Sequence, residues 1–275
     1  MKVEDIQDII YEKEENGICT ITFNRPERRN ALSQVTFLEI QTVLDDMEKD
    51  KNTRVLIMTG SPEGRAFSSG GYFNMKMMTQ IPEEILKEID LMDIAQKKTC
   101  MKFWNFTKPV IAAINGLALG AGFTMPLVGA DLIYMADDPE TYIGLIFVKR
   151  AIIPEFSLSF LLPFYVGFQK AKEILYFGDK IYAKEAEKLG LINKSVPPGD
   201  LMALAREKAE SLIPPKGPSA AIKLMKKTMH DYFRDILSST LDKENEGIQA
   251  SLKTRDFRES TKSLSEKRDP VFKGK

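Results

Sequence analysis

Apolar segments recur along the chain and alternate with longer stretches in which apolar and polar side chains are mixed. Four of the apolar segments are short and rich in β-branched or other strand-forming residues, which predicts β-strands. They are residues 18–23, 55–59, 108–114 and 132–135. Segments with helical character separate them, so the order of elements predicts an α/β fold with mostly parallel strands.

The clearest helix signal begins at Ser33, a residue type that commonly caps the N-terminus of a helix. A helix from there to about Lys49 places four apolar side chains on one face, namely Phe37, Ile40, Leu44 and Met47. A second helix is expected from Met75 to about Lys97, with a break near Pro82.

The clearest boundary between predicted elements near the C-terminus is the proline- and glycine-rich segment 214–218. Helical patterns follow it, at about residues 220–236 and 239–254. We therefore expect a core of residues 1–200, followed by a C-terminal helical region of residues 201–275.

Two glycine-rich turns, at residues 66–71 and 115–122, each follow one of the predicted strands. Glycines let the backbone come close to a ligand, and exposed N–H groups at two such turns can together hold one developing oxyanion. Past the second turn, Glu155 lies among apolar neighbours such as Ile153 and Phe156. From the residues alone, tight packing explains the glycines equally well, and a surface position at a helix start explains Glu155 equally well.

The composition argues against several classes of function. The formal net charge is +0, so the chain has no global basic field that would favour nucleic acid. Cys19 and Cys100 match no metal-binding spacing, and Cys19 is expected to be a buried, inert thiol. His230 is the one histidine and cannot form a histidine-based zinc site by itself, so we expect it on a helix surface. We expect no metal site and no nucleic-acid partner.

Residues 109–130 carry no charged side chain, which on length alone would suit a membrane-spanning helix. Asn115, Pro126 and four glycines interrupt this stretch, so a buried strand, turn and helix explain it better. We therefore expect no membrane association and, by default, a cytoplasmic location. The glycine-rich turns also lack the spacing and the downstream acid of a nicotinamide-binding turn.

Four motifs in this order resemble those of the enoyl-CoA hydratase/isomerase (crotonase) superfamily, and the resemblance extends over essentially the whole chain. They are Asn24-Arg25-Pro26 with Asn30-Ala31-Leu32, the turn at 66–71, the segment 109–122, and Pro154-Glu155-Phe156. The resemblance implies a crotonase-like α/β spiral of ββα units with a C-terminal helical trimerisation region. It also implies an acyl-CoA thioester substrate, a homotrimer or dimer of trimers, and no cofactor beyond the CoA of the substrate.

The resemblance assigns roles to individual residues. It implies that the N–H groups of Gly71 and Ala121 hold the thioester oxygen, and that backbone around the first turn holds the adenine of CoA. Near the C-terminus, it makes Phe272 and Lys273 candidates for holding the CoA of a neighbouring subunit. The full set of expected substrate-binding residues is Ala66, Phe67, Ser68, Ser69, Gly70, Tyr72, Thr124, Phe147, Phe272 and Lys273.

Three positions bear on the reaction. Hydratases of this superfamily use two glutamates to hold water, and here Thr124 and Phe147 stand at those positions. Neither side chain can act as a carboxylate base, which disfavours hydration by that mechanism. Glu155 matches the single catalytic glutamate of Δ3,Δ2-enoyl-CoA isomerases, which predicts conversion of a 3-enoyl-CoA into a 2-trans-enoyl-CoA.

Two alternatives to the isomerase stay open. The chain can be another crotonase-type enzyme, such as an enoyl-CoA hydratase or an acyl-CoA hydrolase, because one scaffold hosts many reactions. It can also be a CoA-binding protein whose catalytic site has decayed. A related question concerns Tyr72, which stands where many members have aspartate and can either line the pocket or simply pack.

Overall fold

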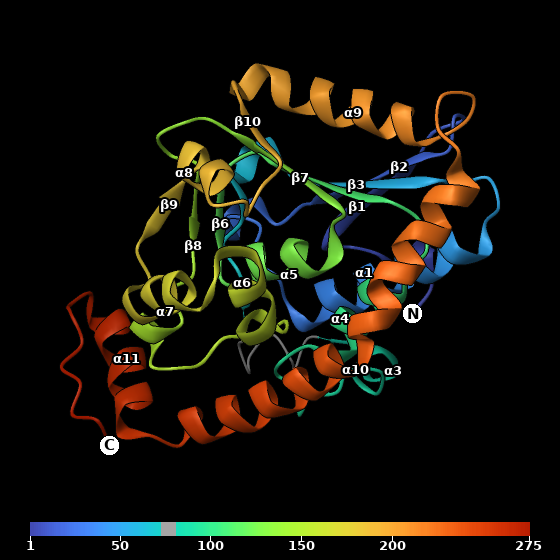
Figure 1. The fold of residues 1–275 in the computed structure, drawn as a ribbon. Coiled ribbons are helices and arrows are strands. Elements are labelled where there is room, and N and C mark those ends of the chain that lie inside the picture. The colour runs from blue at the N-terminus through green and yellow to red at the C-terminus, as the bar shows by residue number, and fades with distance from the viewer. Residues whose placement is uncertain (73–80) are drawn as a thin grey trace.

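The computed structural model describes residues 1–72 and 81–275 of the chain. The expected α/β fold is confirmed, with two sheets covered by helices (Figure 1). The strands are β1 Ile9–Lys13, β2 Ile18–Phe23, β3 Val55–Gly60, β4 Ala66–Ser68, β5 Val110–Ile114, β6 Leu117–Leu119, β7 Leu132–Ala136, β8 Tyr142–Gly144, β9 Lys180–Tyr182 and β10 Lys194–Val196. The helices are α1 Gln34–Lys49, α3 Glu83–Leu86, α4 Lys97–Asn105, α5 Ala121–Gly129, α6 Leu158–Val166, α7 Phe168–Phe177, α8 Ala183–Lys188, α9 Leu201–Leu212, α10 Ser219–Leu252 and α11 Arg255–Glu266.

The larger sheet has six strands in the order β1-β2-β3-β5-β7-β10, and the smaller sheet has four in the order β4-β6-β8-β9. Strands β3, β5 and β7 of the larger sheet are each followed by a strand of the smaller sheet, β4, β6 and β8, and then by a helix. This repeated strand–strand–helix unit confirms the spiral of ββα units.

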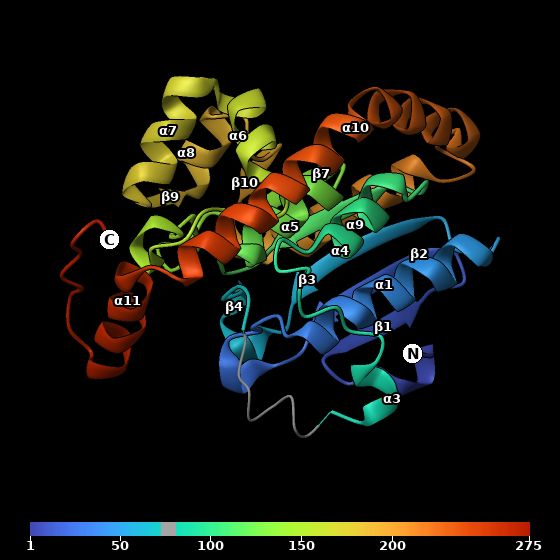
Figure 2. The same ribbon diagram turned by 90° about the horizontal axis from the view of Figure 1, so that it is seen from below.

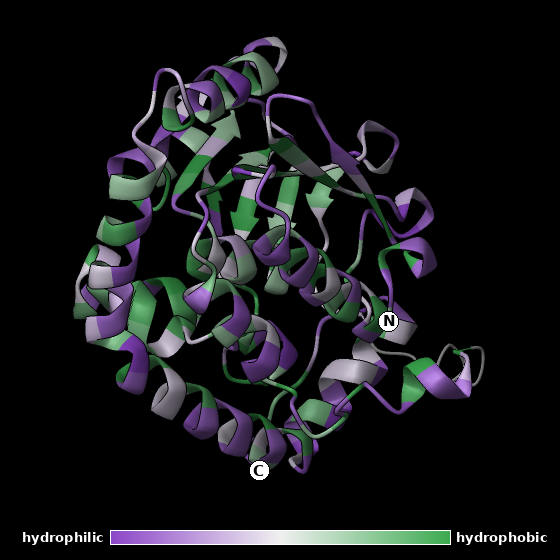
Figure 3. Ribbon diagram, turned by 90° about the vertical axis from the view of Figure 1, so that its right-hand side faces the viewer, coloured by the Kyte–Doolittle hydropathy of each residue, from purple (hydrophilic) through white to green (hydrophobic). Residues whose placement is uncertain are grey.

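Alternate residues of a strand point to opposite faces of a sheet, and the larger sheet uses both faces. Cys19, Ile21 and Leu56 face α1, α4 and α5, in the main hydrophobic core. Ile18, Val55 and Ile57 face α9, in a second buried cluster. Figure 3 shows these strands as a hydrophobic centre, with hydrophilic residues on the surrounding helices.

The C-terminal helices differ from the sequence prediction. One uninterrupted helix, α10, replaces the two expected helices, because a stripe of buried residues that includes Leu237 and Leu241 continues across the expected break. This helix crosses the molecule and packs against α4 and α6 (Figure 2). Helix α11 was not predicted as a separate element. The helix expected from Met75 begins outside the described residues, and α4 starts at Lys97, where that helix was expected to end.

The prediction that His230 lies on a helix surface is wrong. Its ring stacks on Trp104 of α4, with 4.2 Å between ring centroids. The His230 Nδ1 lies 2.8 Å from the carbonyl oxygen of Trp104, and the Trp104 indole N–H donates to the carbonyl oxygen of His230 at 2.8 Å. This reciprocal contact, which helix periodicity alone does not reveal, fixes α10 against α4.

Residues 109–130 form β5, β6 and α5, as expected for this uncharged stretch. No helix in the part of the chain that the structure describes is long and apolar enough to cross a membrane. Cys19 is fully buried, which confirms the expected burial of this thiol.

Candidate active site

Asn30 fixes the backbone that leads into the first glycine-rich turn. Its amide donates to the carbonyl oxygens of Ser61 at 3.2 Å and Ala66 at 2.8 Å. Its carbonyl oxygen accepts from the N–H of Arg25 at 3.1 Å and lies 3.1 Å from the hydroxyl of Ser61. Asn30 is fully buried and adopts a left-handed backbone conformation with φ of 55°. One side chain therefore connects β2, β3 and β4 at the start of the turn.

The two glycine-rich turns lie against each other because β4 and β6 pair in parallel. A Cβ added to Gly70 would lie 2.4 Å from the carbonyl oxygen of Leu119, and a Cβ added to Gly122 would lie 2.4 Å from that of Ser68. Both positions therefore require glycine for close approach of one turn to the other. Gly70 also has φ of +92°, which favours glycine.

The structure brings Gly71 and Ala121 together, as expected for a shared oxyanion site. A Cβ added to Gly71 would lie 4.0 Å from the Cβ of Ala121. Within the described residues, neither backbone N–H donates a hydrogen bond. Ala121 is also the first residue of α5, so the positive end of that helix dipole lies at the site. Two free donors, one of them at a helix N-terminus, can stabilise negative charge on a carbonyl oxygen.

Thr124 and Phe147 lie beside the second turn and supply no ionisable group there. Thr124 is buried on α5, and its hydroxyl has no hydrogen-bond partner among the described residues. The ring of Phe147 is 3.8 Å from where a Cβ of Gly120 would be. Neither of these two positions therefore carries a carboxylate.

Glu155 follows this region along the chain. The N–H of Ile152 donates to the carbonyl oxygen of Phe147 at 3.1 Å, which ties the segment that carries Glu155 to the residue beside Gly120. The Glu155 carboxyl forms no hydrogen bond or ion pair with the described residues. Burial, together with the nearby carboxylate of Glu244, raises the pKa of Glu155 to about 8. A carboxyl group with such a pKa can accept and return a proton near neutral pH.

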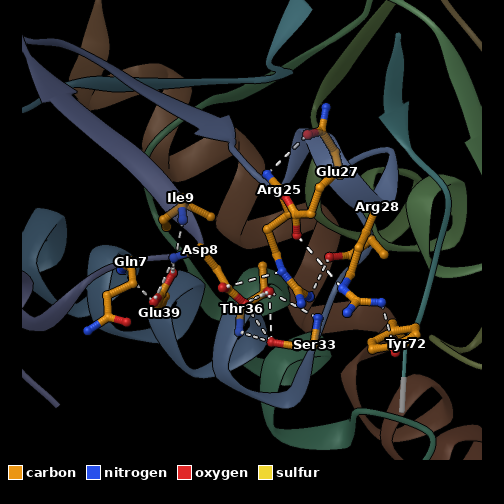
Figure 4. A network of polar contacts seen from close by, with 12 residues as sticks. Gln7, Asp8, Ile9, Arg25, Glu27, Arg28, Ser33, Thr36, Glu39 and Tyr72 are labelled. Carbon is orange, nitrogen blue, oxygen red and sulfur yellow. Dashed lines mark hydrogen bonds and ion pairs between the residues drawn. The ribbon is translucent and has the colours of Figure 1, made fainter. Parts of the chain in front are cut away.

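Tyr72 directly follows Gly71 and contacts two arginines (Figure 4). Its hydroxyl accepts a hydrogen bond from Arg28 at 2.9 Å, and the guanidinium of Arg28 lies 4.6 Å from the ring centroid. Arg25 lies 5.8 Å from the same ring and is held by Asp8, 3.4 Å away, and by the carbonyl oxygen of Ala31. Tyr72 thus joins the first turn to the loop after β2.

The remaining expected residues are four at the first turn and two in the C-terminal tail. At the first turn, Ser69 follows β4, and its hydroxyl donates to the carbonyl oxygen of Arg28 at 2.9 Å. Ala66, Phe67 and Ser68 are buried, and Phe67 packs edge-on against Phe23, so this strand can offer a ligand its backbone rather than its side chains. Phe272 and Lys273 lie in a C-terminal tail held against α11, where Asp256 accepts from the N–H of Lys273 at 2.7 Å. The described contacts of this tail do not reach the two glycine-rich turns.

Sequence reasoning missed the role of Glu244, the charged neighbour of Glu155. This residue is 2% exposed and belongs to the buried stripe of α10, together with Leu237, Leu241 and Ile248. A charged residue in register with an apolar stripe is the signal that could have revealed it.

Comparison with known proteins agrees with this geometry. The family described as enoyl-CoA hydratase/isomerase matches residues 13–275. YngF of Bacillus subtilis (strain 168), named as a member of the same family, is 32% identical over 97% of this chain and 98% of its own length. The 1,2-epoxyphenylacetyl-CoA isomerase of Escherichia coli (strain K12) is 28% identical, over 98% of this chain and all of its own.

Among solved structures, the enoyl-CoA hydratase/isomerase from Pseudoalteromonas atlantica T6c has the same fold. Its TM-score is 0.82 at 23% identity, over 97% of this chain and 100% of that one. The family match covers both glycine-rich turns and Glu155. The chain therefore belongs to the enoyl-CoA hydratase/isomerase family.

Proposed function

We propose that this protein moves the double bond of a 3-enoyl-CoA into conjugation with the thioester, and that Glu155 is its single acid–base group. The Glu155 carboxylate removes a proton from C2, and the electrons of that C–H bond form a double bond between C1 and C2. The electrons of the carbonyl move to oxygen, where the N–H groups of Gly71 and Ala121 stabilise the dienolate. Return of the proton from Glu155 to C4 gives the 2-trans-enoyl-CoA.

The observation that carries this proposal is the carboxyl group of Glu155, which is partly buried and has a raised pKa. Glu155 comes shortly after Ile152, whose N–H donates to the carbonyl oxygen of Phe147. A C–H group beside a thioester is a very weak acid, so its proton transfer needs both a matched base and stabilisation of the resulting oxygen anion. The adjacent free donors of Gly71 and Ala121 support the second requirement.

The lack of a carboxylate at Thr124 and Phe147 favours isomerisation over hydration. Hydration needs a water molecule held and activated next to C3 of the substrate. Phe147 has no polar group for that purpose, and Thr124 offers one hydroxyl without a carboxylate beside it. A double-bond shift needs no water, because the same proton leaves C2 and returns to C4.

Product analysis with the wild-type protein tests this proposal. We expect 3-enoyl-CoA to give 2-trans-enoyl-CoA, seen as growing absorbance of the conjugated thioester, and 2-trans-enoyl-CoA to give little 3-hydroxyacyl-CoA. Rapid formation of 3-hydroxyacyl-CoA would instead establish a hydratase. Binding of acyl-CoA without any product would favour a decayed site. A cytoplasmic location stays a prediction and is not needed for this activity.

The assembly is also part of the proposal. Exposed apolar side chains gather on α6, α7 and the first half of α10, and Phe168 and Tyr232 are 72% and 80% exposed. The two sets adjoin, because Phe164 of α6 lies 5.3 Å from Phe233 of α10 between ring centroids. Such a surface favours association with further copies of the chain. Sedimentation analysis should show a trimer or hexamer, whereas a monomer would contradict this part.

A further inference from the structure

Glu244 is a buried carboxyl group on α10, the helix that packs against α4 and α6. It lies on α10, is 2% exposed, and shares its face of the helix with Leu241 and Ile248. No lysine, arginine or histidine of the described chain forms an ion pair with it. A buried carboxylate without a cationic partner is unfavourable unless hydrogen bonds stabilise it.

Those hydrogen bonds come from the backbone that follows Glu155. The N–H of Ser157 donates to Oε2 of Glu244 at 2.7 Å, and the N–H of Ser159 donates to Oε1 at 2.8 Å. Phe156 and Ser157 both adopt the left-handed conformation, with φ of 57° each. The side chain of Ser157 does not cap α6. Instead, Glu244 of α10 accepts hydrogen bonds from free N–H groups at the N-terminal end of α6.

Two neighbours of Glu244 on α10 complete the contact with this segment. A Cβ at Gly247 would lie 2.3 Å from Cδ1 of Ile153, so glycine there lets α10 approach the residues before Glu155. Asn245 accepts from the N–H groups of Ile94 and Ala95 at 3.0 and 3.4 Å. The carbonyl oxygen of Ala95 in turn accepts from the N–H of Phe156 at 3.3 Å.

We propose that Glu244 is a positioning residue of this site, which fixes the backbone that carries Glu155 and places a second buried carboxyl group near it. The inference rests on the proposed function in that it takes Glu155 as the acid–base group. Other titratable groups of the described chain lie near Glu244. Cys100 of α4 is buried near Glu244, Asp93 lies before α4, and Lys97 pairs with Asp242 at 2.6 Å at the exposed edge.

The sign of the electrostatic effect follows from these contacts. Repulsion from Glu244 raises the pKa of Glu155, in addition to the larger effect of burial. Removal of the Glu244 charge therefore lowers the pH at which Glu155 loses its proton. Loss of an acceptor oxygen also frees one of the two N–H groups and lets the backbone at Ser157 shift.

Three variants separate the effect of the charge of Glu244 from the effect of its hydrogen bonds on the position of the backbone. Glu244→Gln removes the charge and one acceptor, whereas Glu244→Asp keeps the charge and shortens the side chain. Glu39→Gln is the matched control. Glu39 is buried on α1 and accepts from the N–H groups of Gln7, Asp8 and Ile9 (Figure 4). Within the described chain, no electrostatic interaction joins it to Glu155. Its replacement tests whether losing any buried, backbone-bound carboxylate is enough.

The titration of Glu155 is measured by infrared difference spectroscopy against Glu155→Gln, which requires no turnover. With 3-enoyl-CoA as substrate, kcat, KM and the pH of the acidic limb are measured in parallel. We expect Glu244→Gln to titrate at lower pH and to lose about tenfold or more in kcat at similar KM. Glu244→Asp should keep the titration of the wild type and lose kcat, and Glu39→Gln should keep both.

An unchanged Glu155 titration and kcat in folded Glu244→Gln would overturn the proposal. So would a shift of equal size in Glu39→Gln. If Glu244→Gln does not fold, Glu244→Asp decides, because wild-type kcat in that variant would contradict a positioning role. Absence of turnover by the wild type would overturn the proposed function instead, and the infrared titration would still show whether Glu244 controls Glu155.

Discussion

Gly71 and Ala121 are distant in sequence but adjacent in the structure, where a Cβ on Gly71 would lie 4.0 Å from the Cβ of Ala121. Both N–H groups are without a partner in the described chain, and the pairing of β4 with β6 sets their separation. The site therefore depends on how closely one glycine-rich turn packs on the other.

Replacing Gly122 by alanine tests this close packing. The new Cβ would be 2.4 Å from the carbonyl oxygen of Ser68, so the two turns must separate and the donors move. We expect kcat/KM of Gly122→Ala to fall about 100-fold. Gly199→Ala is the control, because a Cβ there meets nothing within 4 Å. Wild-type activity of Gly122→Ala would show that this separation is unimportant.

Asn30 should contribute both to the stability of the fold and to the shape of the first glycine-rich turn. Asn30→Ala removes two hydrogen bonds to carbonyl oxygens and leaves the N–H of Arg25 without its acceptor. We expect a loss of about 2–4 kcal/mol in the free energy of unfolding and a higher KM for acyl-CoA. Asn16→Ala, which removes an exposed acceptor for Ile18, should change unfolding by about 1 kcal/mol and leave KM unchanged. Equal effects of the two variants in urea unfolding would contradict this role.

Lys226 and Lys227 are neighbours on α10, but their replacement should affect stability to very different extents. Lys226 is 4% exposed and donates to Asp131 at 2.7 Å and to the carbonyl oxygen of Lys108 at 3.0 Å. Lys226→Ala should therefore lower the free energy of unfolding by about 3 kcal/mol. Lys227 pairs with Asp231 at the surface, so Lys227→Ala should change it by less than about 1 kcal/mol. Thermal unfolding of both variants measures this difference in stability. An unchanged stability of Lys226→Ala would contradict the prediction.

The raised pKa of Glu155 predicts how stability depends on pH. The folded protein holds this proton up to about pH 8, whereas the unfolded chain releases it near its ordinary value of 4.5. Ionisation of Glu155 therefore lowers the free energy of unfolding as the pH rises from about 4.5 to about 8. Glu155→Gln cannot ionise, so we expect it to be more stable than the wild type by about 4 kcal/mol at pH 8 and nearly equal at pH 4. A difference that shrinks with rising pH would contradict the sign of this shift.

The sequence predicted elements whose signals are local. Helix α1 starts after Ser33 as expected, and the Ser33 hydroxyl accepts from the N–H of Thr36 at 3.1 Å. Strands β2, β3, β5 and β7 fall where apolar runs predicted them. The three-residue strands β4, β6 and β8 are too short to show an alternation, although β4 and β6 place the two glycine-rich turns.

The contacts that shape the site were beyond local reasoning. Glu155 was proposed from a motif, but its pKa depends on Glu244, and Ser157 meets Glu244 across 87 positions of sequence. Asn30 was recognised as part of a motif without a role, because its partners lie on β3 and β4. Such long-range contacts follow from the packing of α10 and of the sheets, which no short pattern encodes.

The most direct test of the account is the rate at which Glu155→Gln forms conjugated enoyl thioester from 3-enoyl-CoA, relative to the wild type. Glutamine keeps the size of the side chain but cannot carry a proton from C2 to C4, so the rate should fall at least about 100-fold while acyl-CoA still binds. The control Glu140→Gln changes an exposed acid and should match the wild type. Wild-type turnover by Glu155→Gln would contradict the central claim that this single carboxyl group performs the reaction.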